Sequence, residues 1–279
     1  MQIYNSLDEV VEIGSIAPDS IVNADCLEAM KFIPDKSIDC IICDLPYGIT
    51  ALKWDIVIPF DLLWEQYKRI VKPNGAIALF GSQPFTSALV MSNPKWFKYE
   101  WIWEKANAGD FMTAKIRPRK KHENILIFSN KSHNYNPQME EGLPYIDRPR
   151  KRSNNIHNST MPKLGIVNIG TRYPSSVFKV GNSNNNISHP TQKPVPLIEY
   201  LIKTYTLENE VILDNTAGSG TLAIACINTN RRYICIEKDL GYFEVMRNRI
   251  ETHDPNTLTT PKKTRKPKAI TEGQLALFG

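Results

Sequence analysis

A glycine-rich turn between an apolar strand and a helix constrains this chain more than any other feature. Residues 211–213 predict a buried strand, a Gly-Ser-Gly turn follows at 218–220, and residues 221–228 predict a helix. Glycine lets the backbone approach a ligand closely, and the amides that open a helix then face that ligand. The next strand, 233–236, leads into Glu237. A carboxylate roughly 20 residues after such a turn can accept hydrogen bonds from ribose hydroxyls, so this unit predicts a nucleoside site.

The turn does not match the motifs that hold phosphate chains. The chain contains no Gly-x-x-x-x-Gly-Lys-Ser/Thr and no Gly-x-Gly-x-x-Gly. A nucleoside cofactor without a pyrophosphate therefore fits better than a dinucleotide. A plain strand–helix turn would also explain the glycines, but it would leave the position of Glu237 a coincidence.

The rest of the chain alternates predicted strands with predicted helices. We expect strands at 20–23, 37–43, 76–80, 97–103 and 124–128, a turn at 72–75, and helices at 26–32, 60–71, 196–205 and 240–252. Alternation of this kind predicts an α/β fold built on a parallel sheet with helices on both faces.

The middle of the chain differs in composition and charge. Residues 130–188 are rich in Asn, Pro, Ser, Arg and Lys and show weak periodicity, which predicts a loop-rich insertion. From 105 to 179 there are 14 Lys and Arg against 5 Asp and Glu, in a chain whose net charge is +5. A solvated surface could carry this charge, but its segregation favours a nucleic-acid partner. The candidate phosphate contacts are Lys115, Arg117, Arg119, Lys120, Lys121, Arg148, Arg150, Lys151 and Arg152.

A second turn, Asp44-Leu45-Pro46-Tyr47, follows the predicted strand 37–43. It therefore lies at the carboxyl end of a sheet strand, where ligands bind in open α/β sheets. A carboxylate, a main-chain carbonyl and an aromatic ring at one place can accept both hydrogens of an amino group on a flat base and stack on its face. Taken alone, these four residues could also form an ordinary β-turn.

Together with His189-Pro190-Thr191-Gln192-Lys193-Pro194, the two turns resemble the β group of DNA amino-methyltransferases, which use S-adenosylmethionine. The resemblance spans about residues 21 to 250, and 189–193 is its most specific piece. It implies a Rossmann-like methyltransferase sheet with an inserted target-recognition region. It also implies that Asp44, Leu45, Pro46 and Tyr47 are catalytic and that the cofactor is held by Asp25, Thr191, Gln192, Lys193, Asp214, Gly218, Ser219, Gly220, Thr221 and Glu237.

The sequence departs from the family pattern at two places. Leu45 replaces the first proline of the catalytic tetrad, but leucine retains the main-chain carbonyl that the family uses, so we expect activity. Asn215-Thr216 replaces Pro-Phe in the cofactor turn, which changes the packing around the cofactor. Asp25 has two interpretations, a contact to the adenine of the cofactor and an N-cap for the helix 26–32.

Several activities are compatible with this motif set. Adenine-specific DNA methylation is the leading hypothesis, because the cytosine-N4 subgroup resembles Ser-Pro-Pro-Tyr more than Asp-x-Pro-Tyr. Methylation of an amino group in RNA or protein also fits the motifs, and so does a catalytically silent DNA-binding protein on the same scaffold. Carbon-5 methylation of cytosine is not expected, because no Pro-Cys pair occurs.

The five cysteines, Cys26, Cys40, Cys43, Cys226 and Cys235, lie in or beside apolar stretches. Because they are few and odd in number, a disulfide framework is not expected, and a reducing cytoplasm is favoured. Cys40 and Cys43 have no second pair to complete a zinc site, so we expect both, like Trp101 and Trp103, to pack in the core, and we expect no metal. No signal peptide or membrane span is predicted.

We expect a catalytic part at 1–129, the basic target-recognition insertion at 130–188, a cofactor-binding part at 189–253 and a flexible basic tail at 254–279. The tail ends in a segment that resembles the peptide with which bacterial DNA enzymes bind the sliding clamp; its contact residues are Gln274, Leu275, Leu277 and Phe278. Expected partners are thus double-stranded DNA and the clamp, with no membrane. The sequence leaves open the recognition site, a restriction-enzyme partner and a homodimer.

Overall fold

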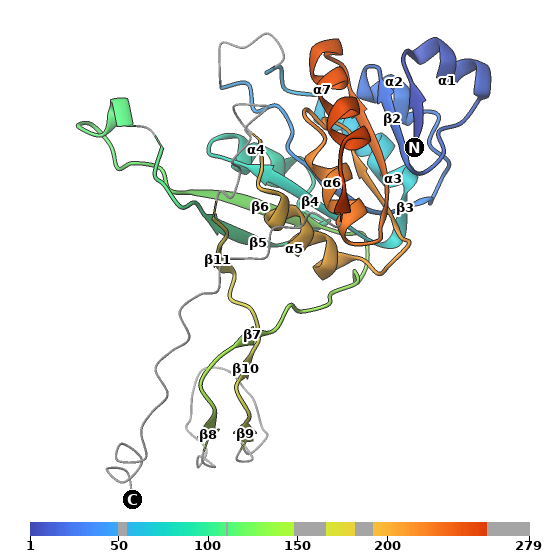
Figure 1. Cartoon of the computed structure of the whole chain (residues 1–279). Coiled ribbons are helices and arrows are strands. Elements are labelled where there is room, and N and C mark those ends of the chain that lie inside the picture. Colours follow the sequence, from blue (N-terminus) through green and yellow to red (C-terminus); the bar gives the residue numbers. More distant parts are fainter. Residues whose placement is uncertain (50–54, 110, 148–165, 182–191, 256–279) are drawn as a thin grey trace, which may run out of the picture.

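A computed structural model of the chain describes residues 1–49, 55–109, 111–147, 166–181 and 192–255 (Figure 1). Its centre is a nine-stranded sheet with the strand order β1-β2-β13-β12-β3-β4-β6-β5-β11. These strands are β1 (Gln2–Tyr4), β2 (Ser20–Asn23), β3 (Ile38–Cys43), β4 (Val71–Gly81), β5 (Phe97–Glu104), β6 (His122–Phe128), β11 (Val177–Lys179), β12 (Val211–Asp214) and β13 (Arg232–Glu237).

The predicted parallel sheet is correct for every strand of this sheet except β6. Strand β6 pairs antiparallel with both β4 and β5, whereas all the other pairs are parallel. The chain leaves β5 through residues 105–121 and returns directly into β6 without a crossover helix. A direct return of this kind can only produce an antiparallel pair.

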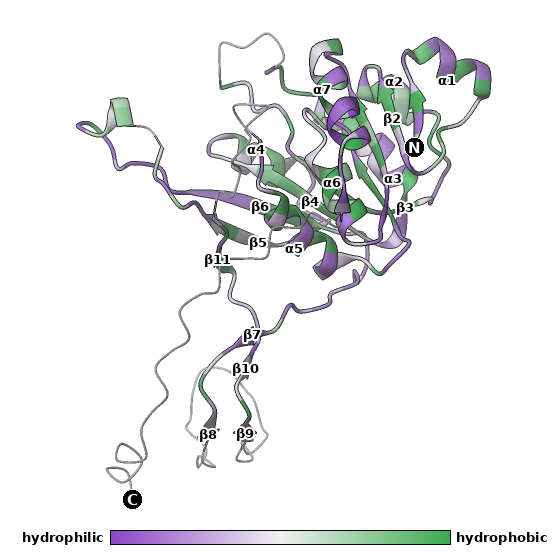
Figure 2. Cartoon of the chain, viewed as in Figure 1, coloured by the Kyte–Doolittle hydropathy of each residue, from purple (hydrophilic) through white to green (hydrophobic). Residues whose placement is uncertain are grey.

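Helices cover both faces of the sheet, as expected for the Rossmann-like class. Helices α1 (Leu7–Ile13), α2 (Cys26–Met30), α3 (Phe60–Ile70) and α4 (Phe85–Ser92) bury their apolar residues in one core cluster. Helices α5 (Val195–Tyr205), α6 (Thr221–Asn228) and α7 (Leu240–Glu251) contribute to a second cluster. Successive residues of β3, β4 and β6 alternate between the two clusters, as the period of two in a strand requires, and Figure 2 shows the hydrophobic sheet between the helices.

Some elements differ from the expectations. Strand β1, helix α1 and helix α4 were not predicted. Helix α1 has a clear start signal, because the Ser6 side chain accepts a hydrogen bond from the Glu9 amide. Residues 72–75 do not form a separate turn but lie within β4, where the pairing shifts from Ile38 opposite Val71 to Cys40 opposite Ala76.

Two segments project from the central domain in Figure 1. One carries the short strands β7 (Glu140–Glu141), β8 (Tyr145–Asp147), β9 (Ile166–Asn168) and β10 (Thr171–Arg172), which form two small antiparallel ribbons. The other, which we call the arm, comprises residues 105–121 between β5 and β6 and carries the short helix η1 (Phe111–Thr113). Strand β11 falls within the range predicted as an insertion, yet it pairs with β5 in the main sheet.

Candidate active site

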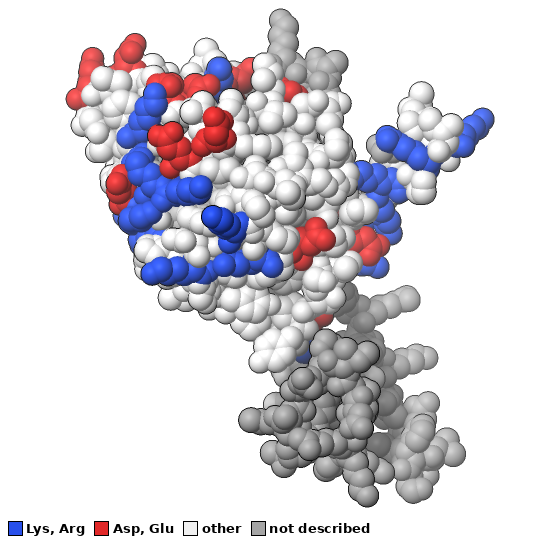
Figure 3. Space-filling view, turned by 180° about the vertical axis from the view of Figure 1, so that it is seen from behind, with Lys and Arg blue, Asp and Glu red and all other residues white. Residues whose placement is uncertain are grey.

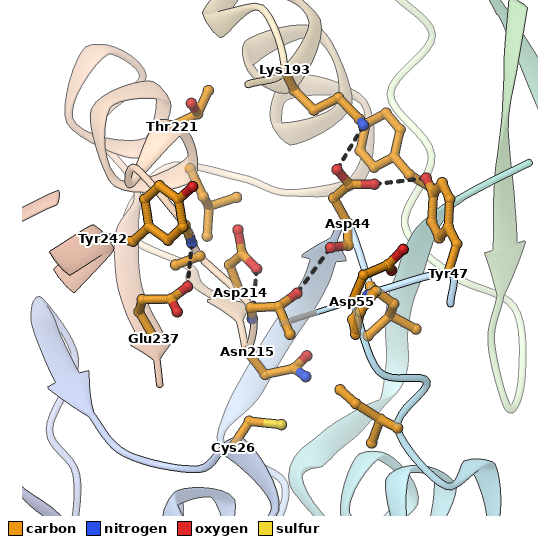
Figure 4. A pocket seen from close by; sticks show the side chains of 18 of the residues that line it. Cys26, Asp44, Tyr47, Asp55, Lys193, Asp214, Asn215, Thr221, Glu237 and Tyr242 are labelled. Atoms are coloured by element: carbon orange, nitrogen blue, oxygen red, sulfur yellow. Dashed lines mark hydrogen bonds and ion pairs between the residues drawn. The ribbon is translucent and has the colours of Figure 1, made fainter. Parts of the chain in front are cut away.

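A pocket of about 980 Å³ lies at the carboxyl ends of the parallel strands (Figure 4). Residues that follow β2, β3, β12 and β13 line it, and so do residues from the arm and from the start of β6. The sheet therefore brings the predicted catalytic turn and the predicted cofactor turn to one cavity, because neighbouring parallel strands end at the same edge.

Asp44 stands directly after the buried strand β3, and both of its carboxylate oxygens have partners. Oδ1 accepts a hydrogen bond from the Tyr47 hydroxyl over 2.7 Å, and Oδ2 lies 2.6 Å from Nζ of Lys193. The Tyr47 ring stacks on Phe85, with 4.9 Å between centroids and 28° between planes. Burial and the nearby Asp44 carboxylate raise the pKa of Tyr47 well above its usual range, so it remains a neutral hydrogen-bond donor. Leu45 of the same turn is buried.

Lys193 was expected with the cofactor residues, but its ammonium group lies among carboxylates of the catalytic half. Besides Asp44, its Nζ is 3.1 Å from Oε2 of Glu123 and 5.0 Å from the centre of the Phe80 ring. Burial opposes its charge, but Asp44 and Glu123 together raise the pKa of Lys193. Burial likewise opposes ionisation of Glu123, but Lys193 and Lys105 lower its pKa to about 2. Lys193 and Glu123 are therefore both charged at neutral pH.

The cofactor turn is held open by glycine and by one carboxylate. Gly218 and Gly220 have φ values of +52° and +75°, which favour glycine. The Gly218 amide donates to Oε2 of Glu237 over 2.7 Å, and the Asp239 amide donates to Oε1 over 2.8 Å. Burial raises the pKa of Glu237. A Cβ on Gly218 would meet nothing within 4 Å, so the turn leaves free space beside it.

Asp214 and Asn215 are buried and line this half of the pocket. Burial raises the pKa of Asp214 to about 7, although its carboxylate accepts a hydrogen bond from the Thr216 amide over 3.1 Å. Oδ1 of Asn215 accepts from the Tyr67 hydroxyl over 2.6 Å. Nδ2 of Asn215 is buried and has no hydrogen-bond partner within the described part of the chain.

The other predicted cofactor residues also gather here. Asp25 caps α2 by accepting a hydrogen bond from the Leu27 amide over 3.0 Å, which confirms the N-cap interpretation, and it also lines the pocket. The Ser219 hydroxyl donates to Oε1 of Gln192 over 3.2 Å, and Thr221 lines the pocket beside them. Thr191 lies outside the described residues.

Comparison with known proteins identifies the family. A family model described as DNA methylase (N6_N4_Mtase) matches residues 38–248, which is more than half of the chain. The chain belongs to this family of DNA methylases. It is 26% identical over 251 residues to the Type II methyltransferase M.HpaI of Haemophilus parainfluenzae, covering 83% of this chain and 74% of that protein. The family expected from the motifs is confirmed.

Solved structures agree with the family fold. The crystal structure of the M1.HpyAVI–SAM complex superposes with a TM-score of 0.56 at 25% identity, covering 82% of this chain and 98% of that one. The PvuII DNA methyltransferase, which is cytosine-N4-specific, gives a TM-score of 0.62 at 14% identity, covering 88% and 89% of the two chains. At this low identity the second likeness concerns the fold alone.

Part of the predicted DNA-binding set lies on the arm of this methylase. Lys120 lines the pocket, while Lys115, Arg117, Arg119 and Lys121 extend along the arm, whose basic side chains are visible in Figure 3. The predicted residues Arg148, Arg150, Lys151 and Arg152, and the clamp-binding residues Gln274, Leu275, Leu277 and Phe278, lie outside the described residues.

Sequence reasoning missed several residues that shape the site. Glu123 has no predicted role, because a parallel strand at 124–128 would begin at the opposite edge of the sheet. Lys105 was counted only as one end of the basic region. Phe85 was missed with helix α4. The sequence marks Thr216 only as a departure from the family pattern, but its hydroxyl donates to the main-chain oxygen of Asp44 over 3.1 Å.

The remaining expectations concern the core, metals and membranes. Trp101, Trp103, Cys40 and Cys43 are buried, and all five cysteines are free, as predicted. In the described part of the chain, no group of three or more His, Cys, Asp or Glu side chains could hold a metal ion. None of the described helices is long and apolar enough to cross a bilayer.

Proposed function

We propose that this DNA methylase transfers a methyl group from S-adenosylmethionine to the exocyclic amino group of adenine in double-stranded DNA, in the cytoplasm. The observation that carries the proposal is the position of Asp44. Its carboxylate opens into the pocket beside the Tyr47 ring, and its main chain is hydrogen-bonded to the turn that carries Gly218 and Ser219. The acceptor for an amino group and the candidate cofactor site thus share one cavity.

The residues of the cofactor half suit S-adenosylmethionine chemically. The cofactor carries positive charge on its sulfonium and its amino group. Asp25, Asp214 and Glu237 line this half with carboxylates, and the raised pKa of Asp214 reflects burial that a cationic ligand would offset. The unused Nδ2 of Asn215 and the open space at Gly218 leave a donor and room for a ligand.

S-adenosylmethionine, when bound, supplies a methyl group that its sulfonium already activates for transfer. The task of the protein is to prepare the nucleophile, because the lone pair of the adenine amino nitrogen is delocalised into the ring. We infer that Asp44 and the Leu45 carbonyl accept the two amino hydrogens, which favours a tetrahedral nitrogen with a directed lone pair. The Tyr47 ring, fixed by Phe85, stacks on the extruded base. The amino nitrogen would form the new N–C bond while the bond between the sulfonium sulfur and the methyl carbon breaks and leaves a neutral thioether, and the nitrogen would then release one proton to water.

Adenine is favoured over cytosine by the first residue of the catalytic turn. The family pattern for cytosine-N4 enzymes resembles Ser-Pro-Pro-Tyr, and this chain has the carboxylate of Asp44 at the position of that serine. Cytosine-N4 methylation remains the second candidate, since both bases present an exocyclic amino group to the same acceptors.

We further propose that DNA contacts both the arm and the inserted region 130–188, and that the segment 254–279 binds the sliding clamp. The arm begins and ends at the pocket, since Lys105 and Lys120 line it. Basic side chains there meet phosphates close to the base that is methylated, and their contribution to affinity does not depend on base sequence.

A radiolabelled methyl-transfer assay tests the proposal. Unmethylated DNA is incubated with the full chain and labelled S-adenosylmethionine, then hydrolysed to nucleosides. Label in N6-methyl-2′-deoxyadenosine is expected, whereas label in N4-methyl-2′-deoxycytidine would support the second candidate. RNA and protein serve as competing substrates, and no label in any of them would indicate a silent DNA-binding protein.

The matched variant for this assay is Asp44→Ala. It should reduce turnover by at least about 100-fold, since preorganised acceptors of this kind contribute that much. Cofactor affinity measured by calorimetry should stay nearly unchanged, because Asp44 acts on the base. Near-wild-type turnover of Asp44→Ala would show the mechanism to be wrong.

A further inference from the structure

A second buried carboxylate, that of Glu123, contacts Lys193. Glu123 is the second residue of β6 and lies opposite Trp103 of β5. Because β6 runs antiparallel to its neighbours, its first residues lie at the edge where β4 and β5 end. This reversal brings Glu123 into the pocket, where its side chain is only 11% exposed.

Lys193 connects Glu123 to Asp44. Nζ of Lys193 lies 2.6 Å from Oδ2 of Asp44 and 3.1 Å from Oε2 of Glu123. Lys105 forms an ion pair with the other oxygen of Glu123. The four side chains therefore alternate in charge from the arm to the catalytic carboxylate.

The two carboxylates hold Lys193 unequally. Asp44 accepts a hydrogen bond from its ammonium group over 2.6 Å, whereas Oε2 of Glu123 is buried and lies 3.1 Å away, at ion-pair distance. An ammonium group has three donors. Oε2 of Glu123 is therefore a second acceptor for the same ammonium group, at a longer distance than Oδ2 of Asp44.

We propose that Glu123 is a positioning residue for methyl transfer, which shares the ammonium group of Lys193 with Asp44 and so keeps the Asp44 carboxylate available to the amino group of the base. This inference rests on the proposed function. When the amino group donates to Asp44, Lys193 can donate to Glu123 without leaving the buried site.

The role follows from the electrostatics of a buried cluster. If Glu123 loses its charge, the attraction of Lys193 is directed to Asp44 alone, and the base must compete with a tighter ion pair. Leaving Lys193 without a partner would be costly, because an unpaired buried charge loses its hydration without compensation. Glu123 thus supplies a second partner for Lys193, so that Asp44 can exchange its contact with Lys193 for a contact with the base.

The variant Glu123→Gln keeps the shape of the side chain and removes its charge. We expect kcat for methyl transfer to fall about 10- to 100-fold. A loss of this size is expected when a reacting group is shifted slightly from its productive position. KM for DNA and the cofactor Kd should stay within about twofold, because Glu123 acts on the catalytic carboxylate through Lys193.

Asp39→Asn is the matched control. Asp39 is also buried and pairs with a lysine, with 2.6 Å between its Oδ1 and Nζ of Lys72, but it lies at the start of β3, at the opposite edge from Asp44. This variant also loses a buried carboxylate–lysine pair, so it reports the effect of reduced stability alone. Its kcat should match that of the wild type.

A double-mutant cycle tests whether the effect passes through Lys193. In the Lys193→Met background, Glu123→Gln should change single-turnover rates by less than about twofold, because the shared cation is absent. An unchanged kcat for Glu123→Gln, or an equal loss in both backgrounds, would overturn the inference. A parallel loss of cofactor binding would show general damage to the pocket and would also overturn it. A wild-type chain that transfers no methyl group would instead overturn the proposed function.

Discussion

The hydroxyl of Thr216 donates a hydrogen bond to the main-chain oxygen of Asp44 over 3.1 Å, although 172 positions separate the two residues in the chain. The same hydroxyl lies 2.9 Å from Sγ of Cys43. Thr216 therefore ties the turn that follows β12 to the catalytic turn that follows β3.

Thr216→Val should remove this hydrogen bond to Asp44 while leaving the volume of the side chain nearly unchanged. We expect the free energy of unfolding in urea to fall by about 1 kcal/mol, the usual net contribution of one hydrogen bond. Turnover should fall as well, because the main chain at Asp44 loses an anchor. Thr216→Ser retains the hydroxyl and should keep near-wild-type turnover; equal losses in both variants would contradict this role.

Glu237→Gln and Gly218→Val should weaken cofactor binding for different reasons. The main-chain amides of Gly218 and Asp239 donate to the two carboxylate oxygens of Glu237. Glutamine keeps one acceptor oxygen, but its NH2 group would face one of these two amides. A β-branched residue is strained at the φ of +52° that Gly218 adopts. Calorimetry with S-adenosylmethionine should show Kd raised roughly 10-fold or more, consistent with about 1–3 kcal/mol for an unsatisfied buried group. Unchanged affinity in both variants would refute the cofactor assignment.

Asp214 should make both cofactor binding and stability depend on pH. Burial raises its pKa to about 7 in the folded chain, above its value when unfolded. The protonated folded state is thus favoured, and this contribution to stability is lost as the pH rises from about 4 through 7. Asp214→Asn should therefore raise the free energy of unfolding at pH 8, on the order of 2–4 kcal/mol.

The same carboxylate should attract the cationic cofactor only when it is ionised. Calorimetry on the wild type is expected to show affinity rising as the pH increases through 7. In Asp214→Asn this rise should be much smaller, with weaker binding at pH 8 despite the greater stability. A wild-type affinity that does not change between pH 6 and 8 would contradict the prediction.

The arm should contribute to DNA affinity through its charge. The double variant Lys115→Gln/Arg117→Gln should lower the slope of log K against log salt by about 2, since each phosphate contact contributes roughly 0.9. Lys68→Gln/Lys203→Gln is the control: these lysines lie in the last turns of α3 and α5, which lead toward the opposite edge of the sheet. An identical slope for the arm variant and the wild type would indicate a solvated surface only.

The C-terminal segment should bind a bacterial sliding clamp. Leu277→Ala/Phe278→Ala removes the apolar side chains that would fill a clamp pocket, so a pull-down should recover the wild type and not the variant. Gln274→Ala is expected to weaken recovery less. Failure of the wild type to bind, or equal binding of both chains, would refute this proposal.

Local sequence was sufficient for the elements and turns that depend on neighbouring residues. The helix 221–228 and the strand 20–23 coincide with α6 and β2, because apolar spacing and turn residues act over a few positions. The motif residues Asp44, Tyr47, Gly218 and Glu237 could likewise be placed at one pocket, since each follows a predicted strand of a parallel unit and such strands end at one edge. Their roles stay predictions.

Only the tertiary structure decided which residues meet from distant parts of the chain. The direction of β6 depends on how the chain returns after β5, and the apolar pattern of 124–128 is the same in either direction. That direction puts Glu123 beside Lys193 and turns a residue without an assigned role into part of the site. The contact of Thr216 with Asp44 has the same origin, because a hydrogen bond between two turns exists only once β12 and β3 are neighbours in the sheet.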